Sequence, residues 1–136
     1  MEIQSFLLCR ELRKVGSGNE YDANLICLHS FYSLDGRFPL EFSLPYYMLL
    51  RRKTREGDET FSLRFNLIDS DGNRVGEPKD VKAISTFPNG HMFMSLQGTI
   101  HFSFPEIGDY RLDITADEEK FPFIFQYNIE VTENPN

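Results

Sequence analysis

Carboxylates in predicted turns are the first side chains whose type and spacing could do chemistry. If the strands between these turns alternate in direction, the carboxylates share one end of the fold and present the oxygen ligands that Ca²⁺ prefers. Aspartate is also favoured in turns because it bonds to its own backbone. Whether these loops bind a cation is therefore left open. The residues concerned are Asp35, Asp69, Asp71, Glu106 and Asp109.

The turn at 69–73 begins like a calcium loop, with Asp69-Ser70-Asp71-Gly72-Asn73. An EF-hand needs glycine at the sixth position and helices on both sides. Here glycine is fourth and the neighbouring segments have strand patterns, so an EF-hand is excluded.

A basic run occupies residues 51–55, with sequence RRKTR. Together with Arg10, Arg13 and Lys14 it could form an anion-binding patch. Acidic residues are expected at the same end, so ordinary solvated surface is the favoured interpretation. The formal net charge of −7 argues against a general nucleic-acid or anionic-membrane binder, because the summed field repels phosphate.

No arrangement of the three histidines predicts catalysis. His29, His91 and His101 lack a Cys, Ser or carboxylate at the spacing of a zinc site or a triad. His29 lies in an apolar segment and is expected to be interior. There is no Gly-rich phosphate loop, CxxC or HExxH. We therefore predict no enzyme activity, no cofactor, and no catalytic, cofactor-binding or metal-binding residues.

The two cysteines and the N-terminus indicate the compartment. Cys9 and Cys27 lie in apolar strand patterns and are interpreted as buried free thiols; whether they are neighbours is left open. Residues 1–4 lack the basic start of a signal peptide. Apolar stretches are far shorter than the ~20 residues that span a bilayer. We predict a cytoplasmic protein without a membrane segment.

One long strand organises the rest of the chain. Every second residue over 92–104 is apolar or glycine, and the residues between them are mostly polar. This period of two predicts a half-buried strand, with Gly98 as a bulge or kink. After a corner, alternation resumes from Tyr110. A tyrosine there is typical of a tyrosine corner, with its hydroxyl bonded to the 104–108 loop.

Similar patterns predict the other elements. The fold class is all-β, an immunoglobulin-like antiparallel β-sandwich of about 7–8 strands, with an up-and-down barrel as the alternative. One domain is expected over 1–132, with a frayed tail over 133–136 and a mobile loop over 11–22. Besides 92–104, strands are predicted near 2–10, 23–32, 38–53, 59–69, 81–84, 110–115 and 121–131.

Exposed apolar residues are the best sequence clue to function. Phe93, Ile68 and Ile124 interrupt polar faces of predicted strands. Pro39 and Pro45 remove backbone donors, so the 38–53 strand is expected to be bent or at a sheet edge. Tyr46, Tyr47 and Leu49 lie in that region, which is then either a partner surface or is covered by another segment of the chain.

The sequence also resembles a family of small bacterial proteins known as a domain of unknown function. The resemblance lies in QSFLLC (4–9), the Phe38-Pro39 segment, the Asp69–Gly72 hairpin and the Phe104–Tyr110 corner. It covers nearly the whole chain and implies an intracellular bacterial β-sandwich. Its motifs are turn and corner residues, so it implies no catalytic or binding residue.

The resulting functional prediction is a non-catalytic protein-interaction or accessory domain. Its partner would be another protein, contacted through a sheet edge around Pro39–Arg55 or through end loops. The alternative is a small-ligand or calcium-dependent recognition module that uses the acidic end loops. Nucleic acid and membrane are not expected as partners. Partner identity, process and oligomeric state are left open.

Overall fold

The structure, a computed structural model, describes residues 1–17, 20–24, 29–76, 81–117 and 124–133. Some predicted features lie outside these ranges. They are Cys27, residues 121–123 of the predicted last strand and residues 134–136 of the predicted tail. Within the described ranges every regular element is a strand. No helix there is long and apolar enough to cross a membrane.

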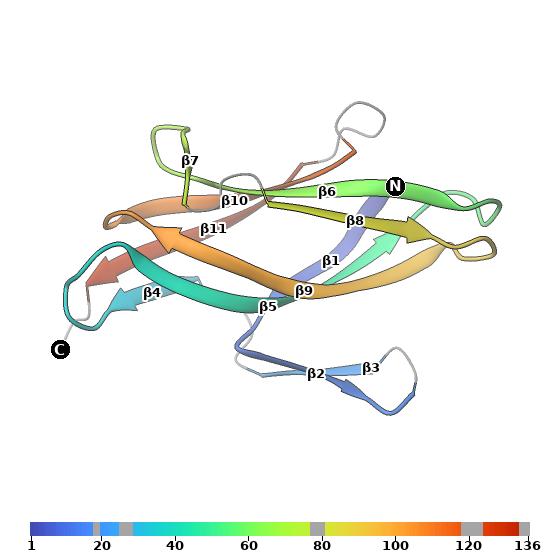
Figure 1. The fold of residues 1–136 in the computed structure, drawn as a ribbon, viewed down its shortest axis with the longest axis horizontal. Helices are drawn as coiled ribbons and strands as arrows, with labels where there is room; N and C mark the ends of the chain where they lie inside the picture. The colour runs from blue at the N-terminus through green and yellow to red at the C-terminus, as the bar shows by residue number, and fades with distance from the viewer. Residues whose placement is uncertain (18–19, 25–28, 77–80, 118–123, 134–136) are drawn as a thin grey trace. The chain divides into compact units, whose positions relative to one another are not determined.

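The described strands form an all-β sandwich of several sheets, as predicted (Figure 1). One sheet has the order β1-β5-β9, and a second has the order β4-β11-β10-β6-β7 with β8 also paired to β6. The β4–β11 pair is parallel, in contrast to the antiparallel prediction for the whole fold. The strands are β1 (Glu2–Leu8), β2 (Glu11–Val15), β3 (Glu20–Asn24), β4 (Ser30–Ser33), β5 (Leu40–Arg51), β6 (Glu59–Ile68), β7 (Arg74–Val75), β8 (Val81–Phe87), β9 (Phe93–Phe104), β10 (Gly108–Ala116) and β11 (Ile124–Glu133).

The residues cluster into two compact units. Unit 1 contains 1–28, 43–61 and 84–100, and unit 2 contains 29–42, 62–83 and 101–136. β5, β6, β8 and β9 each contribute residues to both units. The expectation of one domain over 1–132 stays a prediction.

Eleven described strands exceed the predicted seven to eight. The main cause is that residues 11–15 and 20–24 pair as the antiparallel strands β2 and β3, where a mobile loop was predicted over 11–22. A salt bridge of 2.8 Å between Arg13 and Asp22 spans the two strands of this hairpin. The prediction of one strand over 23–32 is also wrong. Its described residues belong to the end of β3 and to the separate strand β4.

Unit 2 contains the predicted tyrosine corner. Tyr110 is buried, and its hydroxyl donates to the Glu106 carbonyl oxygen at 2.6 Å. The Tyr110 hydroxyl oxygen also accepts from the Glu106 backbone N–H at 3.4 Å. Burial raises the pKa of the Tyr110 phenol. The ring lies 5.1 Å from the Phe104 ring in an edge-on arrangement, so the corner fastens β10 to the end of β9.

Unit 1 rules out the sheet-edge alternative for the proline-marked strand. β5 is continuous through Pro45 and lies between β1 and β9, not at an edge. Proline is tolerated because only its carbonyl is needed there: it accepts from the Cys9 backbone N–H at 3.1 Å. Cys9 itself is a buried free thiol, as predicted, and burial raises its pKa.

Gly98 in β9 has a role that the sequence did not reveal. A Cβ atom there would lie 2.7–2.9 Å from the ring and hydroxyl of Tyr46. The absent side chain therefore makes room for a buried tyrosine ring from the neighbouring strand. Tyr46 is only 5% exposed, so of the two alternatives left open for its region, a partner surface or a covered segment, the covered one applies to this residue.

The tyrosine corner makes a stability prediction. Tyr110→Phe keeps the ring and removes the bond to Glu106, so we expect the free energy of unfolding to fall by about 1 kcal/mol. Urea denaturation measures it. Tyr32→Phe is the control because Tyr32 is half exposed, and it should change little. Equal stability of both variants would contradict the corner's role.

Candidate functional site

The strongest candidate for a functional site in unit 1 is an apolar hollow of about 260 Å³ on β5 and β9. Its lining residues Tyr47 and Leu49 alternate with the buried residues of β5, so they belong to the outward face of the strand. Phe93, at the start of β9, is 52% exposed. The complete lining is Tyr47, Leu49, Pro88, His91, Phe93, Met94 and Ser95.

The β2–β3 hairpin covers one part of this outward face. The Tyr21 ring of β3 lies 5.4 Å from the Tyr47 ring. Of the two expected alternatives for this region, a covering segment and a partner surface, the covering segment therefore applies to Tyr47. Tyr47 has a covering neighbour from the chain itself, whereas Phe93 keeps half of its surface in solvent.

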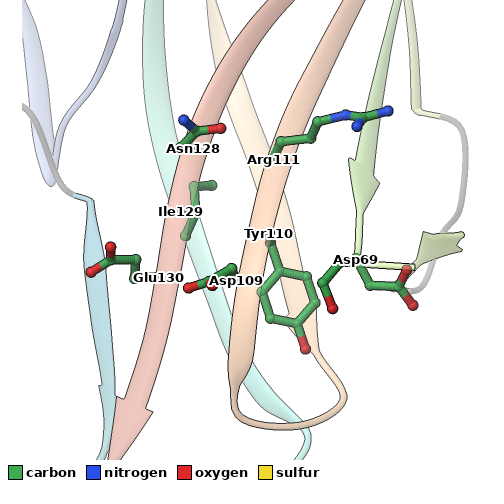
Figure 2. Close-up of a pocket in the computed structure, with 8 residues that line it drawn as sticks. Asp69, Asp109, Tyr110, Arg111, Asn128, Ile129 and Glu130 are labelled. Carbon is green, nitrogen blue, oxygen red and sulfur yellow. The ribbon is translucent and has the colours of Figure 1, made fainter. Parts of the chain in front are cut away.

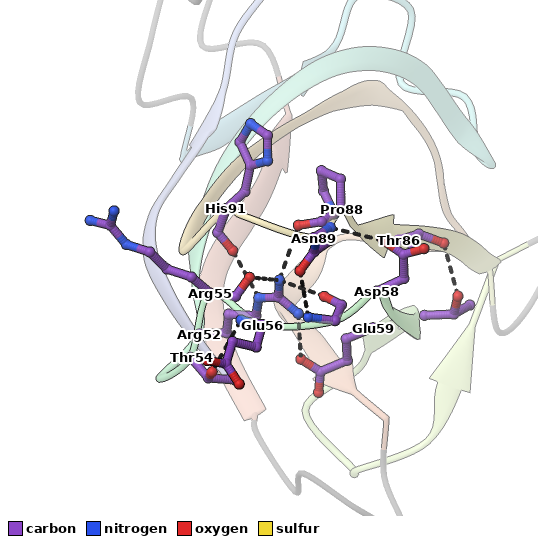
Figure 3. Close-up of polar contacts among 12 residues, drawn as sticks. Arg52, Thr54, Arg55, Glu56, Asp58, Glu59, Thr86, Pro88, Asn89 and His91 are labelled. Atoms are coloured by element: carbon purple, nitrogen blue, oxygen red, sulfur yellow. Dashed lines mark hydrogen bonds and ion pairs between the residues drawn. The ribbon is translucent and has the colours of Figure 1, made fainter.

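A buried arginine determines where the other lining residues lie. Arg52 is only 3% exposed, which corrects its expected place on a solvated basic face. Its Nε donates to the His91 carbonyl at 2.8 Å, and its Nη2 lies within 3.2 Å of the Arg55, Gly57 and Pro88 carbonyls (Figure 3). Its guanidinium carbon lies 5.1 Å from the Phe87 ring centroid, and Glu59 is 3.8 Å away.

Backbone bonds complete this network. Arg52 N–H donates to the Met92 carbonyl at 2.8 Å, and Gly90 N–H donates to the Arg55 carbonyl at 2.6 Å. Asn89 accepts from Gly57 N–H through its side-chain oxygen at 2.7 Å. The 52–57 and 88–92 segments are thus held together, and the second segment supplies Pro88 and His91 to the hollow.

The remaining basic residues of the run stay at the surface. Arg51 pairs with Glu2 at 3.3 Å and lies 5.9 Å over the Phe93 ring. Lys53 and Arg55 are exposed, and within the described ranges neither side chain has an ion-pair partner. Figure 3 shows the Arg55 side chain directed away from the Arg52 network. We call Arg51, Lys53 and Arg55 the basic rim.

Unit 2 contains a second, polar hollow of about 400 Å³ (Figure 2). Asp109 of β10 and Glu130 of β11 stand directly opposite in the antiparallel register, and like charges in such a pair repel. Neither side chain has a hydrogen-bond or ion-pair partner among the described residues. The lining is Asp69, Ser70, Asp109, Tyr110, Arg111, Asn128, Ile129 and Glu130.

The sequence left open whether the five turn carboxylates converge on a cation, and the described residues do not support that alternative. Among the described residues, no three His, Cys, Asp or Glu side chains are arranged to hold a metal ion. Asp69 instead shapes its own hairpin, where its Oδ1 accepts from the Asp71 and Asn73 backbone N–H groups. Asp35 similarly accepts from Arg37 N–H. Of the five turn carboxylates, Asp69 and Asp109 line the polar hollow.

The structure confirms some of the other predictions about exposed and interior residues and contradicts others. Phe93 and Ile124 are exposed as expected, whereas Ile68 is buried. His29 is exposed rather than interior, with its Nδ1 3.0 Å from the Ser30 hydroxyl. His101 is exposed on β9 as expected, 3.8 Å from Glu41.

Comparisons with known proteins bear on the fold. No protein-family model and no curated protein matches the chain, so the resemblance to a domain of unknown function stays a prediction. Among solved structures, the chain is similar to a β-glucuronidase from glycoside hydrolase family 2, with a TM-score of 0.54 and 11% identity over 74% of this chain and 11% of that chain. At this identity the similarity shows the fold alone.

A second similar structure is a family 123 glycoside hydrolase from Clostridium perfringens. Its TM-score is 0.40 at 14% identity, over 82% of this chain and 24% of that chain. Similarity at this level carries no argument about site or function. The chain thus spans 11% and 24% of the lengths of these two structures.

The Arg52 network predicts a large effect of a change that nearly preserves volume. Arg52→Met leaves the carbonyls of both segments without their donor, so we expect a loss of about 3 kcal/mol in the free energy of unfolding. Urea denaturation measures it. Arg55→Met is the matched control and should change little because that side chain is exposed. A mild effect of Arg52→Met would show that water replaces the guanidinium.

Proposed function

We propose that this chain is a non-catalytic, cytoplasmic protein-interaction domain that docks a partner on the outward face of β5 and β9. The observation that carries this proposal is the half-exposed Phe93 beside the outward residues Tyr47 and Leu49. Apolar and aromatic side chains gathered in a hollow are typical of the centre of a protein interface.

The proposal moves the expected contact from a sheet edge to a sheet face. β5 has strands on both sides and therefore offers no free row of backbone donors to a partner strand. Its outward side chains remain accessible at Leu49, next to Phe93. At β5 the partner would thus be recognised through side chains rather than by β-strand addition.

Recovery of partners from the native host tests this function. We expect the Phe93→Ser variant to lose the proteins that the unaltered domain retains, because the apolar contact is removed. Ile84→Ser is the matched control: Ile84 is an apolar residue of unit 1 that is 74% exposed and does not line the hollow. Quantitative mass spectrometry of bound proteins measures the loss. Equal recovery with both variants would contradict docking at Phe93.

The polar hollow supports a second candidate function, the recognition of a small polar ligand. The observation that favours it is the opposed pair Asp109 and Glu130, whose carboxylates lack partners within the described ranges. An amine or a ring of hydroxyl groups, as in a saccharide, would supply donors to both carboxylates and relieve their repulsion.

Thermal melting with a panel of saccharides and amines tests the second candidate. A ligand at about 100 times its Kd should stabilise the protein by about 2.7 kcal/mol, and Glu130→Gln should abolish that shift. Calcium chloride is the comparison ligand, since no carboxylate triad gathers among the described residues. A panel without any shift, or a shift that survives in Glu130→Gln, would contradict recognition at this hollow.

A further inference from the structure

Resting on the proposed function, we infer that the apolar hollow and the basic rim together bind a short acidic–apolar segment of a partner protein. In this segment an aromatic or branched aliphatic side chain fills the hollow, and neighbouring aspartates or glutamates face the basic rim. Docking at Phe93 alone leaves the chemistry of the partner undefined, whereas an acidic–apolar segment defines it.

The apolar half of the segment follows from the lining. The lining includes the apolar and aromatic side chains of Tyr47, Leu49, Phe93 and Met94. Methionine adapts its shape to irregular partners, and the tyrosine and phenylalanine rings offer broad apolar surface. The lining contains no carboxylate and no primary amine. An inserted charged side chain would therefore lose water there without gaining a partner.

The acidic half follows from the position of the basic rim. The Arg51 guanidinium already lies over the Phe93 ring. Lys53 follows Arg52, whose N–H binds the carbonyl of Met92, the residue before Phe93. The carbonyl of Arg55 accepts from Gly90, in the turn that supplies Pro88 and His91 to the hollow. All three cations are thus carried by backbone that adjoins the hollow.

Charge complementarity selects an acidic occupant over a neutral or basic one. Lys53 and Arg55 have no ion-pair partner in the described part of the chain, although the whole chain has a formal charge of −7. Their field acts over about 8 Å at physiological salt. Two unpaired cations beside an apolar hollow therefore favour carboxylates next to the anchor.

The rim is also preorganised for this role. The buried Arg52 guanidinium binds carbonyls of both the rim segment and the turn that lines the hollow. The backbone spacing between the hollow and the basic rim is therefore set before the partner binds. Binding to a preformed site avoids the entropy cost of ordering the receptor.

Selection from a displayed random-peptide library on the immobilised protein tests the inference. We expect the enriched peptides to combine an aromatic or branched aliphatic residue with adjacent Asp or Glu. Synthetic versions should bind about tenfold more weakly to the Lys53→Glu, Arg55→Glu double variant, and also to Phe93→Ser. Lys82→Glu on β8, an exposed charge reversal outside the lining of the hollow, is the control and should bind as the unaltered protein does.

The outcomes separate this inference from the proposed function. Peptides that need Phe93 but are indifferent to the charge reversal overturn the acidic segment and leave docking at Phe93 standing. Peptides indifferent to both variants overturn both. A library without any enrichment overturns the inference, as does binding of polyuridylate RNA that depends on Lys53 and Arg55. Thermal melting checks that each variant is folded, with alanine replacements used if a glutamate variant melts early.

Discussion

The guanidinium group of Arg52 is the constraint on which unit 1 depends. A charged group with almost no contact with water must find hydrogen-bond acceptors, because the loss of hydration is otherwise too costly. Here the acceptors are backbone carbonyls from two segments that are far apart in the chain. The Glu59 carboxylate lies 3.8 Å from the Arg52 guanidinium. The shorter contacts to the guanidinium therefore come from backbone carbonyl oxygens. The arginine thereby joins the 52–57 and 88–92 segments and sets the geometry of the hollow between β5 and β9.

The central position of β5 has a direct functional consequence. A strand paired on both sides can present only its faces, and one face of β5 belongs to the core through Met48 and Leu50. The other face carries Tyr47 and Leu49. The hairpin residue Tyr21 packs on Tyr47, which protects part of an apolar surface that would otherwise be a liability. Phe93 remains uncovered, so the exposed part is small and defined.

The two hollows differ in chemistry because they form on differently patterned strands. In unit 1 the outward residues of β5 are apolar or aromatic beside a basic segment. In unit 2 the outward residues of β10 and β11 are acidic, basic or amide groups. An apolar hollow with cationic flanks suits a protein segment, whereas a polar hollow with opposed carboxylates suits a small ligand rich in donors. A separate functional proposal follows from each.

The sequence by itself determined the elements that depend on local rules. Alternation predicted β6, β9 and β10, because side chains on a strand point to opposite faces. The Asp69–Asn73 turn and the Tyr110 corner were also predictable, since their hydrogen bonds join residues close in the chain. The half-exposure of Phe93 followed from its place in that alternation.

Only the tertiary structure decided the features that depend on residues far apart in sequence. Nothing local separates Arg52 from its basic neighbours, since its acceptors include carbonyls more than thirty positions away. Pro45 suggested an edge, yet a carbonyl bonded to Cys9 is enough to keep β5 central. Gly98 suggested a bulge or kink from the sequence, and only the structure shows the Tyr46 ring in the space that a side chain there would need. In each case the deciding contact joins residues far apart in the sequence, so the residue pattern along the chain does not predict it.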